Sequence, residues 1–261
     1  ISMTQEIPTE EATVLDYMNQ NIGNIILNWT QRPHPLSNSL YHRLQGQYCQ
    51  LELLNTKADN TIIEQLYHAF KSNEETHFKY LKYGPFKTVD EFKQLIATKE
   101  KPSSDTVLYT IFVHDIAVGF ISYIRINQDH GTIEIGNVNF SQDLVRTRQA
   151  TEAMFLLIQF AFDTLGYRRI EWKCNAFNIK SRHAAIRLGF QYEGTWLKAE
   201  ICKNRSRDNA WFSIVDDEWP PIKEELQRWL NSNNFDLHGQ QLTKLNASQV
   251  NPRHSKIIDL N

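Results

Sequence analysis

LVRTRQATEA, residues 144–153, marks the point at which the chain changes from a strand-like to a helix-like pattern. The run before it, GTIEIGNVNF at residues 131–140, is rich in strand-forming side chains. From Gln149 onward, apolar residues recur with a period of about 3.6 and would share one face of a helix that ends at Gly166. A strand that leads directly into a helix start is a common place for a bound phosphate.

The runs on either side of this junction predict a mixed sheet. Three strand-like runs favour an antiparallel meander, at residues 106–115, 117–127 and 131–140. Later runs predict a strand at 168–176, a helix at 181–190, strands at 190–202 and 209–215, and a closing helix at 218–230. Earlier runs predict a strand within 46–54 and helices at 61–71 and 88–98, the second capped by Thr88. This order indicates an α/β (α+β) fold with one crossover between parallel strands.

Three regions follow from the composition. Residues 1–43 are expected to form an N-terminal helix, within residues 10–29, and a proline-containing linker. Residues 44–231 are expected to form the globular domain. Residues 232–261 are rich in Asn, Gln and Ser and have weak periodicity, so we expect a polar tail that is partly disordered.

The bulk properties exclude several classes of function. A formal net charge of −2 argues against nucleic acid or an anionic membrane as a partner. No run reaches the roughly 18 apolar residues that a transmembrane helix needs. The odd number of widely spaced cysteines argues against a disulfide framework, so we expect a cytoplasmic protein. The three cysteines are widely spaced and the nine histidines lack metal-binding spacings, so we expect no metal.

Four runs in a fixed order carry a resemblance to a known family. They are IEIGNVNF, ATEA, GYRRIEWKCNAFN, and the pattern N-x-x-S-x-x-A-A-x-x-L-G-F from Asn178 to Phe190. Together they resemble the core of the GCN5-related N-acetyltransferase (GNAT) superfamily, and most closely its RimJ/RimL-like group. The resemblance implies a mixed, mostly antiparallel twisted sheet flanked by helices, with an N-terminal extension and a C-terminal helix and tail. It also implies acetyl-CoA as the cofactor.

The resemblance assigns the diphosphate of acetyl-CoA to the helix start. The residues it implies are Val145, Arg146, Thr147, Arg148, Gln149, Ala150 and Thr151. The family pattern Q/R-x-x-G-x-G/A places Val145 first and puts Arg148 and Arg146 where glycines are usual, whereas Ala150 fits. Free N–H groups at a helix start suit a diphosphate, and the arginines would add charge-assisted hydrogen bonds. The alternative is a helix start with two solvated arginines and no ligand.

The next strand and helix supply the remaining cofactor contacts that the resemblance implies. Val138, Asn139 and Phe140 would contact pantetheine through their backbone, unless they form an ordinary central strand. Asn178 would bridge cofactor and backbone. The tyrosine that many relatives carry seven residues later is Ala185 here, so Ser181 is the candidate acid for the departing thiolate. The alternative for Ser181 is a helix N-cap or first-turn residue.

A carboxylate is the expected base for the amine. Glu134 is the first candidate, and Glu171 is weaker; the alternative for Glu134 is a solvent-facing strand residue. Glu152 is expected to be structural, as a first-turn acid that favours the helix dipole and caps amides.

The resulting hypothesis is an acetyl-CoA-dependent N-acetyltransferase that acts by direct attack in a ternary complex and releases coenzyme A. The acceptor would be a primary amine, either a protein or peptide N-terminus or a small amine. Helices within residues 60–98 and the hairpin at 195–210 would wall the acceptor site, and the protein would be a monomer or homodimer. The alternative is a non-catalytic acyl-CoA-binding or interaction module of the same fold.

Overall fold

The structure is a computed structural model that describes residues 13–15, 21–24, 26, 28–55, 60–100 and 105–253. The chain divides into two compact units, Ile1–Gln31 and Arg32–Asn261. In the described residues, no helix is long and apolar enough to cross a bilayer.

The N-terminal unit contains two short antiparallel strands, β1 (Thr13–Leu15) and β2 (Asn21–Asn24), where we expected a helix. The expectation was wrong for these residues. β1 begins with two β-branched residues, and β2 contains Ile22 next to Gly23, a combination that favours extended backbone over helix. The rest of the expected helix lies outside the described residues, apart from Ile26, Asn28 and Trp29.

The large unit begins at Arg32, twelve residues before the predicted domain start at Leu44. The backbone N–H of Arg32 donates to the Gln128 carbonyl at 2.9 Å. The Tyr41 ring packs edge-on against Phe160 at 4.9 Å, and its carbonyl accepts a bond from the Tyr109 hydroxyl. Residues 32–43 therefore belong to the globular unit rather than to a linker.

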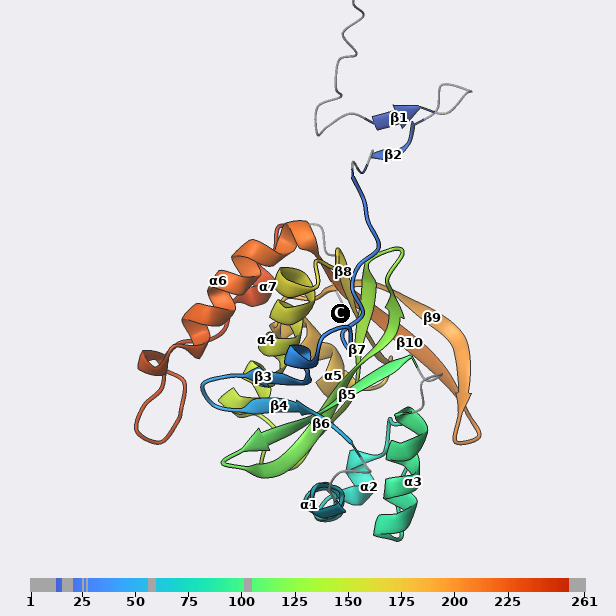
Figure 1. The fold of residues 1–261 in the computed structure, drawn as a ribbon, viewed down its shortest axis with the longest axis vertical. Coiled ribbons are helices and arrows are strands. Elements are labelled where there is room, and N and C mark those ends of the chain that lie inside the picture. Colours follow the sequence, from blue (N-terminus) through green and yellow to red (C-terminus); the bar gives the residue numbers. More distant parts are fainter. Residues whose placement is uncertain are drawn as a thin grey trace, which may run out of the picture. The chain divides into compact units, whose positions relative to one another are not determined.

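An eight-stranded sheet forms the centre of the large unit, with the order β3-β4-β5-β6-β7-β8-β10-β9 (Figure 1). The strands are β3 (Arg43–Gln45), β4 (Gln50–Leu53), β5 (Thr106–Val113), β6 (Ile116–Asn127), β7 (Thr132–Phe140), β8 (Arg169–Asn175), β9 (Gln191–Cys202) and β10 (Arg205–Val215). Only the β7–β8 pair is parallel, and the strands on either side pair antiparallel. The predicted fold class and the meander of β5, β6 and β7 are confirmed.

Helices cover both faces of this sheet. One face carries α4 (Arg148–Gln159), α5 (Ile179–Arg187) and α6 (Trp219–Leu230), which share the main core with strand residues such as Ile133 and Ile170. The other face carries α1 (Asn60–Lys71) and α3 (Val89–Lys99), with the short α2 (Glu74–His77) between them. α4 continues through a π-helical turn, Phe160–Thr164, and Gly166 follows with a φ of 68° that suits glycine.

The described part of the C-terminal segment, residues 232–253, is packed rather than partly disordered. It contains a 3-10 turn (Ser232–Asn234) and α7 (Ala247–Val250), and Ala247 is fully buried. Asn234 is buried, and hydrogen bonds satisfy its polar atoms. Its amide donates to the Trp229 carbonyl and its oxygen accepts from the Thr243 N–H, both at 2.9 Å. Polar composition predicted disorder, but these side chains satisfy backbone groups inside the fold. Residues 254–261 lie outside the described residues.

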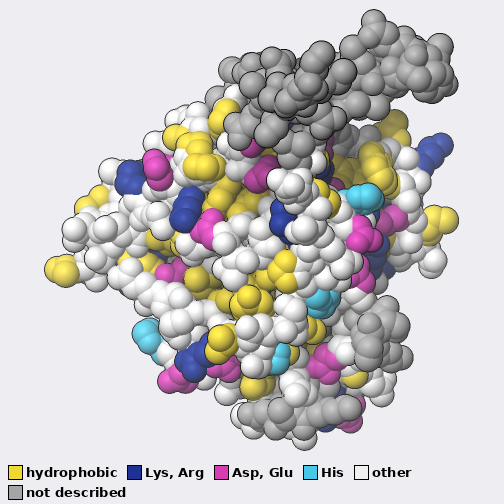
Figure 2. Space-filling view, turned by 45° about the horizontal axis from the view of Figure 1, so that its top comes forward, with side chains coloured by type: hydrophobic (Ala, Val, Ile, Leu, Met, Phe, Trp, Pro, Cys, Tyr) yellow, Lys and Arg dark blue, Asp and Glu magenta, His cyan; other side chains and the backbone are white. Residues whose placement is uncertain are grey.

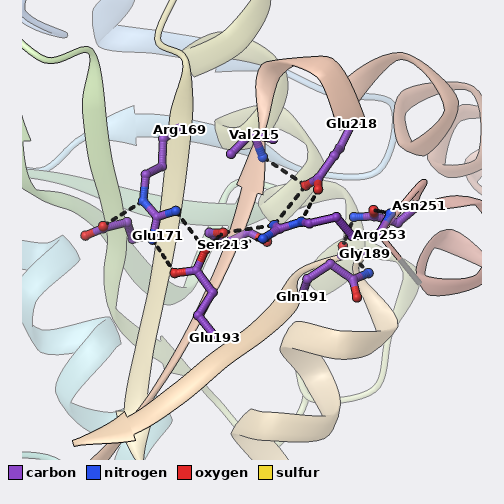
Figure 3. A network of polar contacts seen from close by, with 10 residues as sticks. All are labelled: Arg169, Glu171, Gly189, Gln191, Glu193, Ser213, Val215, Glu218, Asn251 and Arg253. Carbon is purple, nitrogen blue, oxygen red and sulfur yellow. Dashed lines mark hydrogen bonds and ion pairs between the residues drawn. The ribbon is translucent and has the colours of Figure 1, made fainter. Parts of the chain in front are cut away.

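Arg253 ties the end of this segment to β10 and to the 3-10 turn (Asp216–Glu218) that precedes α6 (Figure 3). Its guanidinium donates to the Ser213 carbonyl and hydroxyl and to Glu218, each at 3.0 Å. It also pairs with Glu193 at 3.3 Å, and Arg169 binds the same carboxylate from β8. We call these five residues the Arg253 network. It joins the C-terminal segment to three strands and to the turn before α6.

Candidate functional site

β7 and β8 part at the middle of the sheet. Their parallel pairing runs from Thr132–Arg169 to Glu134–Glu171, and the recorded register ends there. Along its other edge β7 carries a bulge, because its pairing with β6 shifts between Gly136 and Asn139 and Asn137 has a φ of 47°. The end of β7 therefore diverges from β8.

The side chains of diverging β7 alternate between the two faces. Val138 and Phe140 pack against the main core, on the side of α4. Asn139 is fully buried on the other side, where its amide donates to Tyr83 Oη at 2.8 Å and its oxygen lies 3.0 Å from His77 Nε2. These contacts hold the bulged strand against the α2–α3 loop.

The start of α4 presents unpaired backbone donors. Thr147 is the N-cap: its hydroxyl oxygen accepts from the Ala150 N–H at 3.2 Å and its O–H donates to the Leu144 carbonyl at 2.7 Å. Among the described residues, no partner exists for the N–H groups of Arg146, Arg148 and Gln149. Three adjacent donors at the positive end of a helix form an anion site.

The two arginines of this turn differ. Arg146 adopts the left-handed φ of 66°, where glycine is usual, at a cost of about 1–2 kcal/mol. Its side chain is exposed. Arg148 is helical, and its guanidinium lies between two rings, 4.3 Å from the centroid of Tyr48 and 5.2 Å from that of Phe235. The alternative of solvated side chains therefore describes Arg146 but not Arg148.

A cavity of about 730 Å³ opens beside this turn. Its lining consists of Phe140, Gln142, Val145, Arg146, Thr147, Arg148, Ala150, Thr151, Met154, Trp172, Lys180, His183, Ala184, Arg187, Leu188, Trp229, Phe235, Gly239, Gln240 and Gln241. Four of these side chains are Arg or Lys, and none is Asp or Glu. On the face that Figure 2 shows, basic and acidic side chains are intermixed. The cavity lining differs from that face because its Arg and Lys side chains are not accompanied by Asp or Glu.

Part of the predicted cofactor set lies in this lining, namely Phe140, Val145, Arg146, Thr147, Arg148, Ala150 and Thr151. The other members lie outside it, namely Val138, Asn139, Gln149, Asn178 and Ser181. Sequence reasoning missed the nitrogen-bearing side chains of α5 in the lining, although Lys180, His183 and Arg187 recur at helical spacing. It also missed Trp229 and residues 235–241, which carry no local motif.

Ser181 lies in the first turn of α5, next to a residue of the cavity lining. Asn178 is the N-cap and its side-chain oxygen accepts from the Ser181 N–H at 3.2 Å, so Ser181 is not the cap. Trp172 Nε1 donates to Ser181 Oγ at 3.1 Å. The hydroxyl oxygen accepts this bond, so the bond to Trp172 does not use the hydroxyl hydrogen, which can donate to another acceptor. The Cys174 thiol is a further polar group beside this hydroxyl.

Glu134 lies on the opposite face of the sheet and is only 2% exposed, so the solvent-facing alternative is wrong. Burial raises the pKa of its carboxyl group to about 7, although Lys173 and Arg125 oppose the shift. Arg125 Nε lies 3.3 Å from its Oε2. Glu171 is less suited to the role of base, because its carboxylate is already held by Arg169 at 2.9 Å and by Arg125 at 3.3 Å.

Aromatic and charged side chains surround Glu134 on this face. The Trp211 ring lies 4.8 Å from the Arg125 guanidinium and 5.2 Å from Lys173 Nζ. Trp211 Nε1 is buried without a hydrogen-bond partner. The β9–β10 hairpin meets the α2–α3 loop here, since Arg207 donates to the Tyr80 carbonyl at 2.9 Å.

Glu152 holds a neighbouring loop rather than the start of its own helix. Its buried carboxylate accepts backbone N–H bonds from Gln47 and Tyr48 at 2.7 Å and from Cys49 at 2.8 Å. The expected structural role is thus observed, but the amides belong to the β3–β4 turn and not to α4. This contact places Tyr48 where its ring stacks on Arg148.

Comparison with known proteins identifies the class to which this fold and site belong. Residues 52–191 match the family model of the acetyltransferase (GNAT) domain, which is more than half of the chain. A GCN5-related N-acetyltransferase from Brucella melitensis is 37% identical, with a TM-score of 0.78 over 84% of this chain and 97% of that one. A probable GNAT-family acetyltransferase from Chromobacterium violaceum is 40% identical, with a TM-score of 0.68 over 75% and 94%.

The acetyltransferase MccE, which confers microcin C7 self immunity, shares the fold at 24% identity, with a TM-score of 0.58 over 65% of this chain and 93% of that one. Its crystal structure is a complex with acetyl-CoA and AMP. The chain belongs to the GNAT family, and it is an acetyltransferase.

Proposed function

We propose that the protein transfers the acetyl group of acetyl-CoA to a primary amine, by direct attack in a ternary complex. One observation carries this proposal: a large cavity with four Arg or Lys side chains and no carboxylate adjoins three free N–H groups at the start of α4. Coenzyme A is a polyanion with a diphosphate, and the residues present fit it.

The residues of this chain divide the binding of the cofactor between two elements. The N–H groups of Arg146, Arg148 and Gln149 would bind the diphosphate, and the Arg148 guanidinium, fixed between two rings, would add a charge-assisted bond. The backbone of Val138, Asn139 and Phe140 would bind pantetheine where β7 parts from β8. Acetyl-CoA supplies the thioester whose acetyl group is transferred.

The two candidate catalytic residues lie on opposite faces of the sheet, one on each side of the gap between the diverging strands. Glu134 accepts a proton from the amine on the Trp211 side, where its raised pKa suits a base near neutral pH. Ser181 donates a hydrogen bond to the departing thiolate on the α5 side. The amine would add to the thioester carbonyl from the Trp211 side, and the tetrahedral intermediate would then expel the thiolate toward Ser181 on the α5 side.

We further propose a RimJ/RimL-like acceptor, which is a protein or peptide N-terminus, with small amines as the second possibility. The pattern of Asn178, Ser181 and Ala185 supports this group assignment. Cytoplasmic location and a monomeric or homodimeric state stay predictions.

An acetyl-transfer screen of peptides and small amines tests the proposal. Wild-type protein should release free thiol and give an acetylated amine. Glu134→Gln and Ser181→Ala should lower kcat by about 100-fold or more while acetyl-CoA binding persists. Unchanged turnover in both variants would refute their roles. Tight acetyl-CoA binding without thiol release from any amine would favour the non-catalytic alternative.

A further inference from the structure

Arg187, at the end of α5, has no anionic partner among the residues that the structure describes. Its Nη1 donates to Thr151 Oγ1 at 3.1 Å, and its guanidinium lies over the Trp229 ring, 4.8 Å from the centroid. Within the described part of the chain it pairs with no carboxylate, in contrast to Arg228, which pairs with Glu225. The side chain is reached by solvent through the cavity, yet the surrounding protein lowers its pKa by desolvation.

The wall beside Arg187 comes from the C-terminal segment, beyond residues 52–191 that the family model matches. It consists of Trp229, Phe235 and residues 239–241, which we call the C-terminal wall. Trp229 Nε1 donates to Gln241 Oε1 at 2.9 Å, so the amide NH₂ of Gln241 stays available to a ligand. The Phe235 ring packs edge-on against Trp229 at 5.1 Å and contacts Arg148.

The cavity therefore has two groups of donors for anions. One is the α4 start with Arg148, to which the proposed function assigns the diphosphate. The other group consists of Arg187 and the amide of Gln241. A diphosphate bound at the α4 start does not use this second group. Coenzyme A carries a second anionic group, the phosphate on the 3′-oxygen of its adenosine, which a planar guanidinium binds through two parallel hydrogen bonds.

We propose that Arg187 and the C-terminal wall form a subsite for the 3′-phosphoadenosine end of coenzyme A, so that the protein selects coenzyme A over 3′-dephospho-coenzyme A. This inference rests on the proposed function. Contacts with the Trp229 ring and Thr151 restrict the guanidinium, which reduces the conformational freedom that binding must remove. Gln240 and Gln241 supply amides for the edge of the adenine.

Isothermal titration with coenzyme A and with 3′-dephospho-coenzyme A tests the subsite. Wild-type protein should bind the dephospho form about 10- to 100-fold more weakly, the range of a charge-assisted bond. Arg187→Ala should bind coenzyme A as weakly as wild type binds the dephospho form, and should leave affinity for the dephospho form unchanged. Arg205→Ala, at the β9–β10 turn and outside the cavity lining, is the charge-matched control and should change neither affinity.

Gln241→Glu is a second variant that keeps an oxygen to accept the Trp229 N–H, so it preserves the wall. It places a negative charge near the expected phosphate and should weaken coenzyme A binding at least about tenfold more than dephospho-coenzyme A binding. Equal affinities of wild type for both ligands would overturn the subsite and leave the proposed function standing. Binding of neither ligand would overturn the proposed function itself.

Discussion

Glu134 combines deep burial with a pKa near the working pH of most cells. Because burial raises its pKa to about 7, half of the carboxyl groups are ionised near neutrality. A base acts only when ionised, so we expect kcat/KM to rise with pH through about pH 7 and then to level off. Steady-state kinetics over this range measure it. Glu134→Gln should lack this rise, and a variant that retains it would show that another group titrates.

The burial of Glu134 also makes the stability of the folded protein depend on pH. The folded pKa of about 7 exceeds the ordinary value of 4.5, so the folded state binds this proton more tightly than the unfolded chain does. The stabilising contribution is therefore present below about pH 4.5 and is lost as pH rises through 7. Glu134→Gln should raise the Tm relative to wild type at pH 8, and by less at pH 5. A lower Tm at both pH values would contradict this account.

Some features of individual residues could be predicted from the sequence, and others could not. The pattern around Asn178 led to Ser181, which lies in the first turn of α5, and a strand position led to Glu134 on β7; their catalytic roles stay predictions. The burial of Glu134 was not predictable, because it depends on Arg125, Lys173 and Trp211, which come from other strands. Nor did the pattern show that Arg146 takes the left-handed conformation while Arg148 stays helical.

At the scale of elements, the β3–β4 turn and α4 act as one unit. Glu152 reaches across more than a hundred residues to bind three backbone N–H groups, and this places Tyr48 on Arg148. Local pattern identified the strand and the helix, but it could not show this pairing, because periodicity carries no information on distant partners.

Glu152→Gln should therefore affect both stability and cofactor binding. An amide retains one acceptor oxygen and turns an NH₂ group toward backbone donors, so we expect a loss of about 1.5–3 kcal/mol in the free energy of unfolding. Chemical denaturation measures this loss, and titration should show weaker acetyl-CoA binding because Tyr48 shifts. Asp143→Asn, at an exposed position of the preceding loop, is the control. Equal stability of Glu152→Gln and wild type would refute the coupling.

At the scale of the whole molecule, the C-terminal segment completes both the fold and the cavity. The family model ends at residue 191, but Trp229, Phe235 and Gln241 line the cavity, and Arg253 fastens the same segment to β10. The polar composition predicted a tail, because Asn, Gln and Ser side chains are usually exposed to solvent. In the fold these residues bind backbone groups, for example Asn251, which donates to the Gly189 carbonyl at 2.9 Å.

Arg253→Ala should lower the Tm, because the nearly buried Glu218 carboxylate then loses its cation. We expect a loss of about 3 kcal/mol, reduced if water enters, and a smaller loss for Arg253→Lys, which keeps the charge. The Glu193 carboxylate has a pKa lowered to about 2 because hydrogen bonds from Arg169, Ser213 and Arg253 outweigh the opposing effect of partial desolvation. Its stabilising contribution is present above about pH 4.5 and is lost as pH falls through 2, so the Tm difference between Arg253→Ala and wild type should shrink in acid.

The central claim is that the cationic cavity at the start of α4 binds acetyl-CoA. Isothermal titration of the full chain with acetyl-CoA tests it most directly, with Arg148→Ala beside the wild type. We predict micromolar or tighter binding to the wild type and about 10- to 100-fold weaker binding to Arg148→Ala, which loses a guanidinium held between two rings. Absence of detectable binding to the wild type would contradict the account.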